Sequence, residues 1–200
     1  MRLILIRHAL PERVETATDA PDPPLSSIGL RQVDALVETL AGERIDAVWA
    51  SPLARARQTA QPLADARGLP VQVHDGLREF DFGDGLYIPA EDTEHPAVRA
   101  IAARMDDQEG NVDLLDFQRV VVAAIGDIIA VTAPDATAAV SCHGGVINAY
   151  AAAVLRVPDV FFGKISYTGT SWFTVSRSGR VRLVTLNEHA HVRALDPTRG

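Results

Sequence analysis

Two arginines and two histidines stand out because each follows closely on a run of apolar residues: Arg7, His8, Arg55 and His143. Guanidinium groups bind the oxygens of phosphate or carboxylate in a forked geometry. A neutral imidazole placed among them can attack a phosphorus atom in line, and water can then cleave the phosphohistidine that forms. Such chemistry depends mainly on positioning and on neutralised phosphoryl oxygens, which enough cations supply without Mg²⁺. If these side chains meet in the fold, we therefore expect phosphoryl transfer.

Three apolar runs are the elements that must position these side chains. Residues 3–6, 45–50 and 136–142 are predominantly apolar without strict alternation, which is typical of strands buried on both faces of a parallel sheet. The carboxyl ends of such strands meet at one edge, where open α/β sheets bind their ligands. The sequence therefore predicts that the groups following the three strands share one crevice.

The residues after the second strand predict the start of a helix. Ser51 is a suitable N-cap and Pro52 a suitable first helical residue, so that Arg55 falls in the first turn. Arg57 is the alternative cation, but the first-turn position favours Arg55. This placement directs a second guanidinium toward the crevice.

His143 is followed by two glycines, Gly144 and Gly145, which let the backbone turn sharply from the third strand into a helix over residues 146–155. The free amides at a helix N-terminus favour an anion. A core histidine is the alternative interpretation of His143, but a pair of glycines after it is a poor choice for packing alone.

An acidic and aromatic segment at residues 77–85 supplies candidate carboxylates. It can place an acid beside apolar rings, where the pKa of a carboxyl group rises. Strand-like alternation puts Glu79 and Asp81 on one face, so both are candidates.

The remaining elements complete an α/β pattern. Helical periodicity covers residues 25–40 and 116–132. Residues 170–176 and 181–186 alternate on either side of a Ser-Gly turn, which predicts a C-terminal antiparallel hairpin at the edge of the sheet.

Length and composition exclude several classes of protein. The 200 residues fit one domain, which we place at residues 1–200 with a lid at about 84–116. No apolar run approaches the ~20 residues that span a bilayer, and the start lacks the apolar region of a signal peptide, so we expect a cytoplasmic protein without membrane contact. The net charge of −7 lacks the basic field that nucleic acids need. The oligomeric state stays open, with a homodimer as one option.

Two conspicuous features predict no site. Cys142 is the single cysteine, and we expect it to be buried and inert. His189 and His191 have the spacing of two ligands on one strand face, but they lack a third ligand. We therefore predict neither a metal nor a cofactor.

Five short motifs along residues 1–150 resemble, in order, those of the histidine phosphatase superfamily, which includes cofactor-dependent phosphoglycerate mutases and many phosphatases. Residues 6–8 are similar to Arg-His-Gly, 25–32 to Leu-Thr-x-x-Gly-x-x-Gln, 51–60 to Ser-x-Leu-x-Arg-Ala-x-x-Thr-Ala, 77–83 to Leu-x-Glu-x-x-x-Gly, and 141–146 to Ser-His-Gly-Gly with one residue inserted. Five motifs in this order are a specific signal. The resemblance implies a three-layer α/β/α sandwich with a mostly parallel mixed sheet, similar to phosphoglycerate mutase.

The same resemblance implies roles for six residues. His8 is the nucleophile, and Glu79, rather than Asp81, is the acid that protonates the leaving oxygen and then the base for water. The phosphoryl group is held by three side chains and a backbone amide: Arg7, Arg55, His143 and Gly144. His8, Glu79 and His143 are thereby the catalytic residues.

The chain also departs from the pattern of this family. Ala9 replaces the glycine after His8, residues 85–88 replace a Trp-Glu-Gly continuation, and the lid offers only Arg99 and Arg104 as cations. A mutase must hold a carboxylate and two phosphates in turn, which needs more positive charge. We therefore predict a phosphomonoester hydrolase that acts through phospho-His8 on a small phosphorylated metabolite. A phosphoglycerate mutase-like transferase and a weakly active phosphate-binding regulatory module are the alternatives.

Overall fold

The strands form one mixed sheet in the part of the chain that the computed structural model describes, residues 1–14, 22–80, 99 and 112–195. Their order across the sheet is β3-β2-β4-β1-β5-β6. Their bounds are β1 Arg2–Arg7, β2 Ala47–Ala50, β3 Val71–Val73, β4 Thr137–Cys142, β5 Thr170–Val175 and β6 Val181–Glu188.

The register of the parallel strands brings three strand ends to one edge. β1 pairs with β4 so that Arg7 lies opposite Cys142, and β4 pairs with β2 so that Ser141 lies opposite Ala50. β5 and β6 pair antiparallel and extend the sheet beyond β1, as the alternating pattern predicts. The three strands predicted to be buried therefore share their carboxyl edge.

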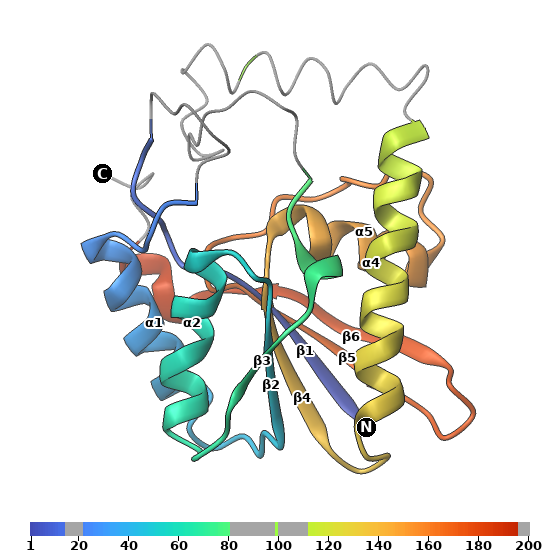
Figure 1. The fold of residues 1–200 in the computed structure, drawn as a ribbon, viewed down its shortest axis with the longest axis horizontal. Coiled ribbons are helices and arrows are strands. Elements are labelled where there is room, and N and C mark those ends of the chain that lie inside the picture. The colour runs from blue at the N-terminus through green and yellow to red at the C-terminus, as the bar shows by residue number, and fades with distance from the viewer. Residues whose placement is uncertain (15–21, 81–98, 100–111, 196–200) are drawn as a thin grey trace.

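Helices cover both faces of this sheet (Figure 1). Those on one face are α1 (Ser27–Thr39) and α2 (Ala54–Asp65), and those on the other are α4 (Val112–Val131) and α5 (Gly144–Leu155). Two short 3-10 turns lie at Asp75–Leu77 and Ala190–Leu195. The predicted three-layer α/β/α sandwich is thus confirmed.

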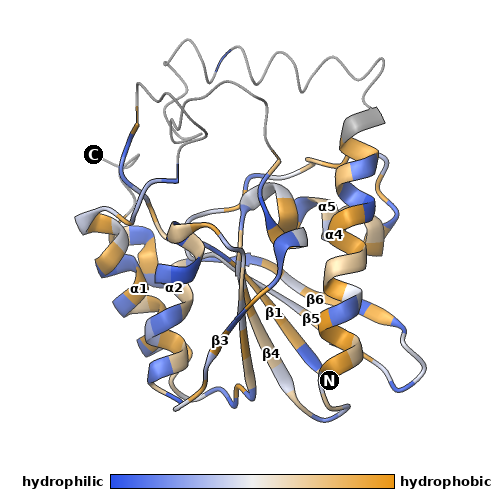
Figure 2. Cartoon of the chain, in the orientation of Figure 1, coloured by the Kyte–Doolittle hydropathy of each residue, from blue (hydrophilic) through white to orange (hydrophobic). Residues whose placement is uncertain are grey.

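Alternate residues of β1 contribute to the two halves of the core. Leu3 and Leu5 pack in the cluster formed with α4 and α5, whereas Ile4 and Ile6 pack in the cluster formed with α1 and α2. Burial of each such side chain stabilises the fold by roughly 2 kcal/mol. Figure 2 shows the apolar character of β1 and of much of α4. Because β1 is covered on both faces, it needs no alternation of polarity.

The start of α2 differs from the prediction. The helix begins at Ala54 with Leu53 as its N-cap, so the prediction that Ser51 caps it is wrong, although Arg55 remains in the first turn. Asp22 binds this helix end instead, because its carboxylate accepts the N–H of Ala54 at 2.8 Å. The interaction joins the loop before α1 to the start of α2.

Several predictions lie beyond what the structure tests. Most of the lid at about 84–116, together with Asp81, lies outside the described residues. The single domain, the cytoplasmic location and a homodimer stay predictions. Among the helices that the structure describes, none is long and apolar enough to cross a membrane.

Candidate active site

His8 directly follows β1 and is held by two hydrogen bonds. Its backbone N–H donates to the carbonyl of Cys142 at 2.9 Å, which continues the pairing of β1 with β4. Its Nδ1 lies 2.7 Å from the carbonyl oxygen of Ala9. Because a carbonyl only accepts, Nδ1 carries the hydrogen and Nε2 keeps a lone pair. Nε2 is therefore the nitrogen that can act as a nucleophile.

The backbone that follows this histidine is fixed by side chains from α1 and α2. The N–H of Ala9 donates to Thr59 Oγ1 at 2.9 Å, and the N–H of Leu10 donates to Gln32 Oε1 at 2.8 Å. Gly29 lets α1 approach closely, because a Cβ there would lie 2.1 Å from the carbonyl oxygen of Leu10. The motif residues of both helices thus hold the nucleophile loop.

The methyl group of Ala9 is accommodated by packing. It lies in a small buried cluster with Leu25 and Val33, and Ala9 is fully buried. The substitution of the motif glycine therefore adds to the core beneath the loop and leaves the backbone contacts of the loop in place.

Arg7 ends β1 and is oriented by residues from other parts of the chain. Its guanidinium carbon lies 3.7 Å from the ring centroid of Tyr167, and its Nη1 donates to the carbonyl of Ile165 at 2.5 Å. A Cβ on Gly144 would lie 3.7 Å from Arg7 Nε, so the first residue of α5 is beside the guanidinium. Tyr167 was not found from the sequence, because no pattern around it marks a site.

Arg55 brings the second guanidinium from the first turn of α2, and it is only 3% exposed. Its Nη1 lies 3.6 Å from a carboxylate oxygen of Asp22, which also binds the helix end. Arg57, the alternative cation, is exposed. The burial of Arg55 therefore supports it, rather than Arg57, as the cation of the site. Like Tyr167, Asp22 is a residue near the site that was not predicted from the sequence.

His143 connects β4 to α5 and is completely buried. Its ring centroid lies 5.1 Å from that of His8, and its Nε2 lies 2.8 Å from Ser51 Oγ. The two histidines predicted from separate motifs thus meet at the shared edge of β1 and β4. Ser51, predicted only as a helix cap, contacts one of them.

Glu79 lies against the start of α5. Its Oε2 accepts the N–H of Gly145 at 3.2 Å, and its Oε1 accepts the N–H of Phe80 at 3.0 Å. A Cβ on Gly145 would lie 2.2 Å from Oε1, so only glycine allows this approach. Burial raises the pKa of Glu79, although these two amides and the nearby arginines lower it. The carboxyl group of Glu79 therefore binds a proton more readily than an exposed glutamate does.

The surroundings of the two buried histidines favour their neutral forms. Burial lowers the pKa of His8 well below its usual value, and His143, Arg55 and Arg7 lower it further. Burial also lowers the pKa of His143, again with the two arginines. A neutral imidazole keeps a lone pair, which is what a nucleophile at neutral pH requires.

Other conspicuous side chains lie away from this pocket or are inert. Cys142 is buried in the core, and burial raises the pKa of its thiol.

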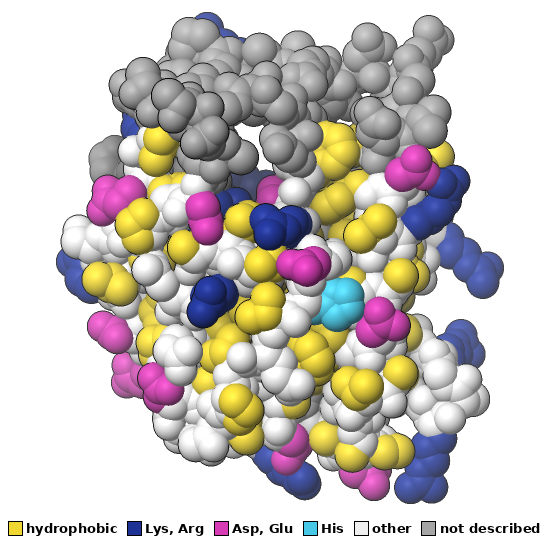
Figure 3. All heavy atoms as spheres, viewed as in Figure 1, with side chains coloured by type: hydrophobic (Ala, Val, Ile, Leu, Met, Phe, Trp, Pro, Cys, Tyr) yellow, Lys and Arg dark blue, Asp and Glu magenta, His cyan; other side chains and the backbone are white. Residues whose placement is uncertain are grey.

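Among the described residues, no group of three potential ligands could hold a metal ion. On the face that Figure 3 shows, acidic and basic side chains are interspersed, with no continuous basic patch among the described residues.

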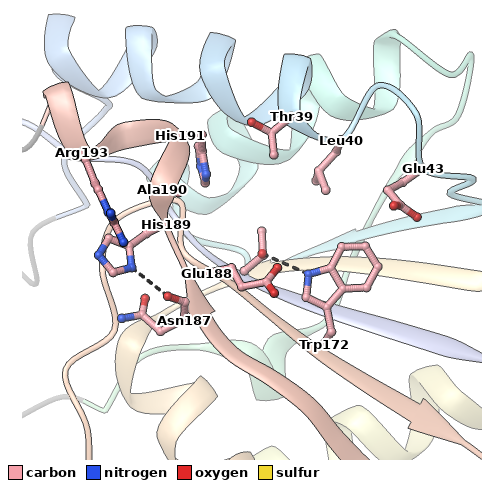
Figure 4. Close-up of a pocket in the computed structure, with 11 residues that line it drawn as sticks. Thr39, Leu40, Glu43, Trp172, Asn187, Glu188, His189, Ala190, His191 and Arg193 are labelled. Atoms are coloured by element: carbon pink, nitrogen blue, oxygen red, sulfur yellow. Dashed lines mark hydrogen bonds between the residues drawn. The ribbon is translucent and has the colours of Figure 1, made fainter.

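A separate pocket of about 500 Å³ lies between the end of α1 and the β5–β6 side of the sheet (Figure 4). His189 and His191 line it, but both are bonded to the protein itself. His189 Nδ1 lies 2.7 Å from the carbonyl oxygen of Asn187, and His191 Nε2 lies 3.1 Å from Thr168 Oγ1. None of the six predicted site residues lines this pocket.

The fold and the site together define a class of protein. An α/β sandwich that buries two neutral imidazoles and two guanidiniums at the carboxyl edge of its parallel strands is suited to bind and transfer a phosphoryl group. The family model of the histidine phosphatase superfamily (branch 1) matches residues 3–189, and the chain belongs to this superfamily. The predicted family and the predicted enzyme class, a phosphatase, are confirmed.

Individual relatives are also phosphatases. The chain is 31% identical over 196 residues to glucosyl-3-phosphoglycerate phosphatase of Mycobacterium tuberculosis, covering 88% of this chain and 85% of that protein. It is 38% identical over 85 residues to phosphoserine phosphatase 1 of Hydrogenobacter thermophilus, covering 42% of this chain and only 40% of that protein. The solved structure of a mycobacterial glucosyl-3-phosphoglycerate phosphatase superposes with a TM-score of 0.77 at 25% identity, covering 94% of this chain and 99% of that one.

Proposed function

We propose that this phosphatase hydrolyses phosphomonoesters of small metabolites that carry a carboxylate, through a phosphohistidine on His8. The observation that carries this proposal is the buried convergence of His8 and His143 with Arg7 and Arg55. A neutral imidazole with a free lone pair meets the needs of a nucleophile, and paired guanidiniums meet those of a dianionic phosphoryl group.

In the first half-reaction, Nε2 of His8 attacks the phosphorus in line with the ester oxygen. The N–P bond forms as the P–O bond breaks, and the leaving oxygen takes the proton of the Glu79 carboxyl group. The phosphoryl oxygens are held by four groups: the guanidiniums of Arg7 and Arg55, the imidazole of His143 and the amide of Gly144.

In the second half-reaction, water cleaves the phosphohistidine. The Glu79 carboxylate, left without its proton by the first step, takes a proton from water as the water oxygen attacks phosphorus. The N–P bond breaks, and its electron pair returns to Nε2 of His8. Inorganic phosphate leaves, and both His8 and Glu79 regain their starting forms.

Arg78 supports a carboxylate as the second recognition element of the substrate. It directly precedes Glu79, its side chain is 58% exposed, and its charge is close enough to contribute to the lowered pKa of His143. Two of the relatives are named for phosphoserine and glucosyl-3-phosphoglycerate. Both compounds carry a carboxylate besides the phosphoester. A guanidinium at the margin of the phosphate pocket can pair with such a group.

A phosphate-release screen without added metal tests this function. Phosphoserine, 3-phosphoglycerate, glucose 6-phosphate and AMP are compared, with the His8→Ala variant as control. We expect the two carboxylate-bearing esters to be hydrolysed best, with a loss of at least ~10³-fold in the variant. The Arg78→Ala variant should lower kcat/KM for those esters by roughly fivefold and leave p-nitrophenyl phosphate nearly unaffected.

Either of two results would contradict hydrolysis as the function and support one of the alternatives. Isomerised phosphoglycerate in place of free phosphate would identify a mutase-like transferase. Tight binding of inorganic phosphate without turnover of any ester would identify a phosphate-binding regulatory module. Equal turnover of all four esters would contradict the role of the carboxylate and leave the His8 mechanism intact.

A further inference from the structure

Ser51 contacts the imidazole of His143 in the interior of the protein. Its Oγ lies 2.8 Å from His143 Nε2, and both residues are fully buried. The residue follows β2, and its backbone N–H donates to the carbonyl of Ser141 at 2.9 Å, so its position is fixed by the sheet. The serine side chain is therefore hydrogen-bonded to a histidine and does not cap the helix, contrary to the prediction.

Counting donors and acceptors favours the Ser51 hydroxyl as the donor in this hydrogen bond. Ser51 Oγ already accepts the N–H of Leu53 at 3.4 Å, and the acceptor that its hydroxyl hydrogen meets among the described residues is His143 Nε2. If the hydroxyl donates, Nε2 uses its lone pair to accept. A neutral imidazole then carries its single hydrogen on Nδ1.

Nδ1 of His143 is buried and has no hydrogen-bond partner in the described part of the chain. A buried N–H without an acceptor is destabilising, and an incoming oxygen anion would satisfy it. A bare lone pair at the same place would repel a phosphoryl oxygen. The tautomer of His143 therefore decides whether this position attracts or repels the substrate.

The same count separates the two histidines of the pocket. In His8, the carbonyl of Ala9 holds the hydrogen on Nδ1, so that the lone pair is on Nε2. In His143, with the Ser51 hydroxyl as donor, the Nε2 lone pair accepts the hydroxyl hydrogen and cannot attack phosphorus. The two imidazoles are similarly buried, but the carbonyl oxygen of Ala9 leaves His8 able to attack phosphorus, whereas Ser51 Oγ leaves His143 able to donate a hydrogen bond.

We propose that Ser51 is a positioning residue that fixes His143 in the Nδ1–H tautomer, making it a hydrogen-bond donor to the phosphoryl group and leaving attack to His8. This inference rests on the proposed function, because it assigns the free Nδ1 hydrogen to a phosphoryl oxygen. The tautomer itself is a property of the protein without substrate.

Nitrogen-15 NMR of the imidazole side chains tests the tautomer directly. In the wild-type protein we expect His143 to be neutral with its hydrogen on Nδ1. In Ser51→Ala we expect this tautomer to lose its dominance and kcat/KM to fall roughly 10–100-fold, the range found when the hydrogen-bond partner of a metal-bound histidine is removed. Ser51→Thr keeps a hydroxyl and should restore both readouts in part.

Ser141→Ala is the matched control. Ser141 is also a buried serine at this sheet edge, but its Oγ has no hydrogen-bond partner in the described residues. This variant should keep the wild-type tautomer and activity.

Three outcomes would overturn the inference. A wild-type His143 with its hydrogen on Nε2 would do so even if no variant folds. Activity of Ser51→Ala within twofold of both wild type and Ser141→Ala would do so as well, as would lost activity with an unchanged tautomer. Unchanged turnover in His8→Ala would instead defeat the proposed function, and the measured tautomer would still stand.

Discussion

The molecule contains two pairs of histidines whose surroundings are opposite. His8 and His143 are far apart in the sequence, yet their ring centroids lie 5.1 Å apart, close enough to two buried guanidiniums to be affected by their charge. His189 and His191 are separated by one residue and line a partly open pocket on another part of the sheet. Proximity in the sequence therefore says little here about which histidines form a site.

The difference lies in how deeply the rings are buried and in the charges beside them, since each of the four rings has one nitrogen bonded to the protein. His189 and His191 each place a ring nitrogen against a protein oxygen, on Asn187 and Thr168 respectively. In the buried pair, one nitrogen of each ring is likewise bonded to a protein oxygen, but both rings are buried beside the guanidiniums of Arg7 and Arg55, which lower their pKa values further. Parallel strands that end at one edge create this arrangement, which a local pair cannot imitate.

Substitution of one histidine from each pair gives the largest contrast. His8→Ala should reduce kcat/KM by at least ~10³-fold, because it removes the attacking atom. His189→Ala should stay within about twofold of wild type, since surface changes away from a site are usually small in effect. Steady-state hydrolysis of p-nitrophenyl phosphate measures both. A comparable loss of kcat/KM in the two variants would show that the two pairs do not differ in their importance for catalysis.

Glu79→Gln separates the nucleophile from the acid. Hydrolysis of phosphoserine should fall by about 10²-fold or more, because its alkoxide leaving group needs a proton. The first step with p-nitrophenyl phosphate should be far less affected, since nitrophenolate leaves without one. Stopped-flow measurements should then show a burst of nitrophenolate followed by slow turnover, as phosphohistidine accumulates. Equal losses with both substrates and no burst would argue against the proposed role of Glu79.

A methyl group at Gly145 tests how closely that acid must approach α5. In Gly145→Ala the new Cβ would lie 2.2 Å from Glu79 Oε1, so the carboxyl must move. We expect roughly tenfold lower kcat/KM for phosphoserine with a modest change in stability. Gly126→Ala is the control, because Gly126 is in α4 and nothing lies within 4 Å of its added Cβ. That variant should keep full activity and be up to ~1 kcal/mol more stable.

The sequence could predict the parts of the site that rest on strand topology. Apolar runs ending in Arg7-His8 and in His143 place both at one edge whatever the detailed packing, and the register of β1 and β4 follows. It could not predict Tyr167 or Asp22, because their roles depend on how distant loops return to Arg7 and Arg55.

Ser51 shows the limit of local rules most clearly. As a serine before a proline it has the pattern of a helix cap, but the helix starts at Ala54 and its end is bound by Asp22. The hydroxyl of Ser51 instead forms a hydrogen bond with His143, which is far away in the sequence. A tertiary partner thus overrides a sound local preference, and only the structure shows that partner.

Acid should destabilise the protein through the buried pair more than through the partly open one. Burial lowers the pKa of His8 well below its usual value and lowers that of His191 as well. The unfolded chain therefore binds more protons below about pH 6.5 than the native protein, and the free energy of unfolding falls as pH falls through that value. Above about pH 7.5 both states are neutral at these positions, and the contribution is constant.

Urea unfolding of wild type, His8→Asn and His191→Asn at about pH 7.5 and about pH 5 measures this difference. Removing His8 should reduce the acid-induced loss of stability, because one group that must bind a proton on unfolding is gone. Removing His191 should reduce it less, since this ring is only partly buried and its pKa is lowered less. If His191→Asn had the larger effect, the buried pair would not be the one that the fold holds neutral against protonation.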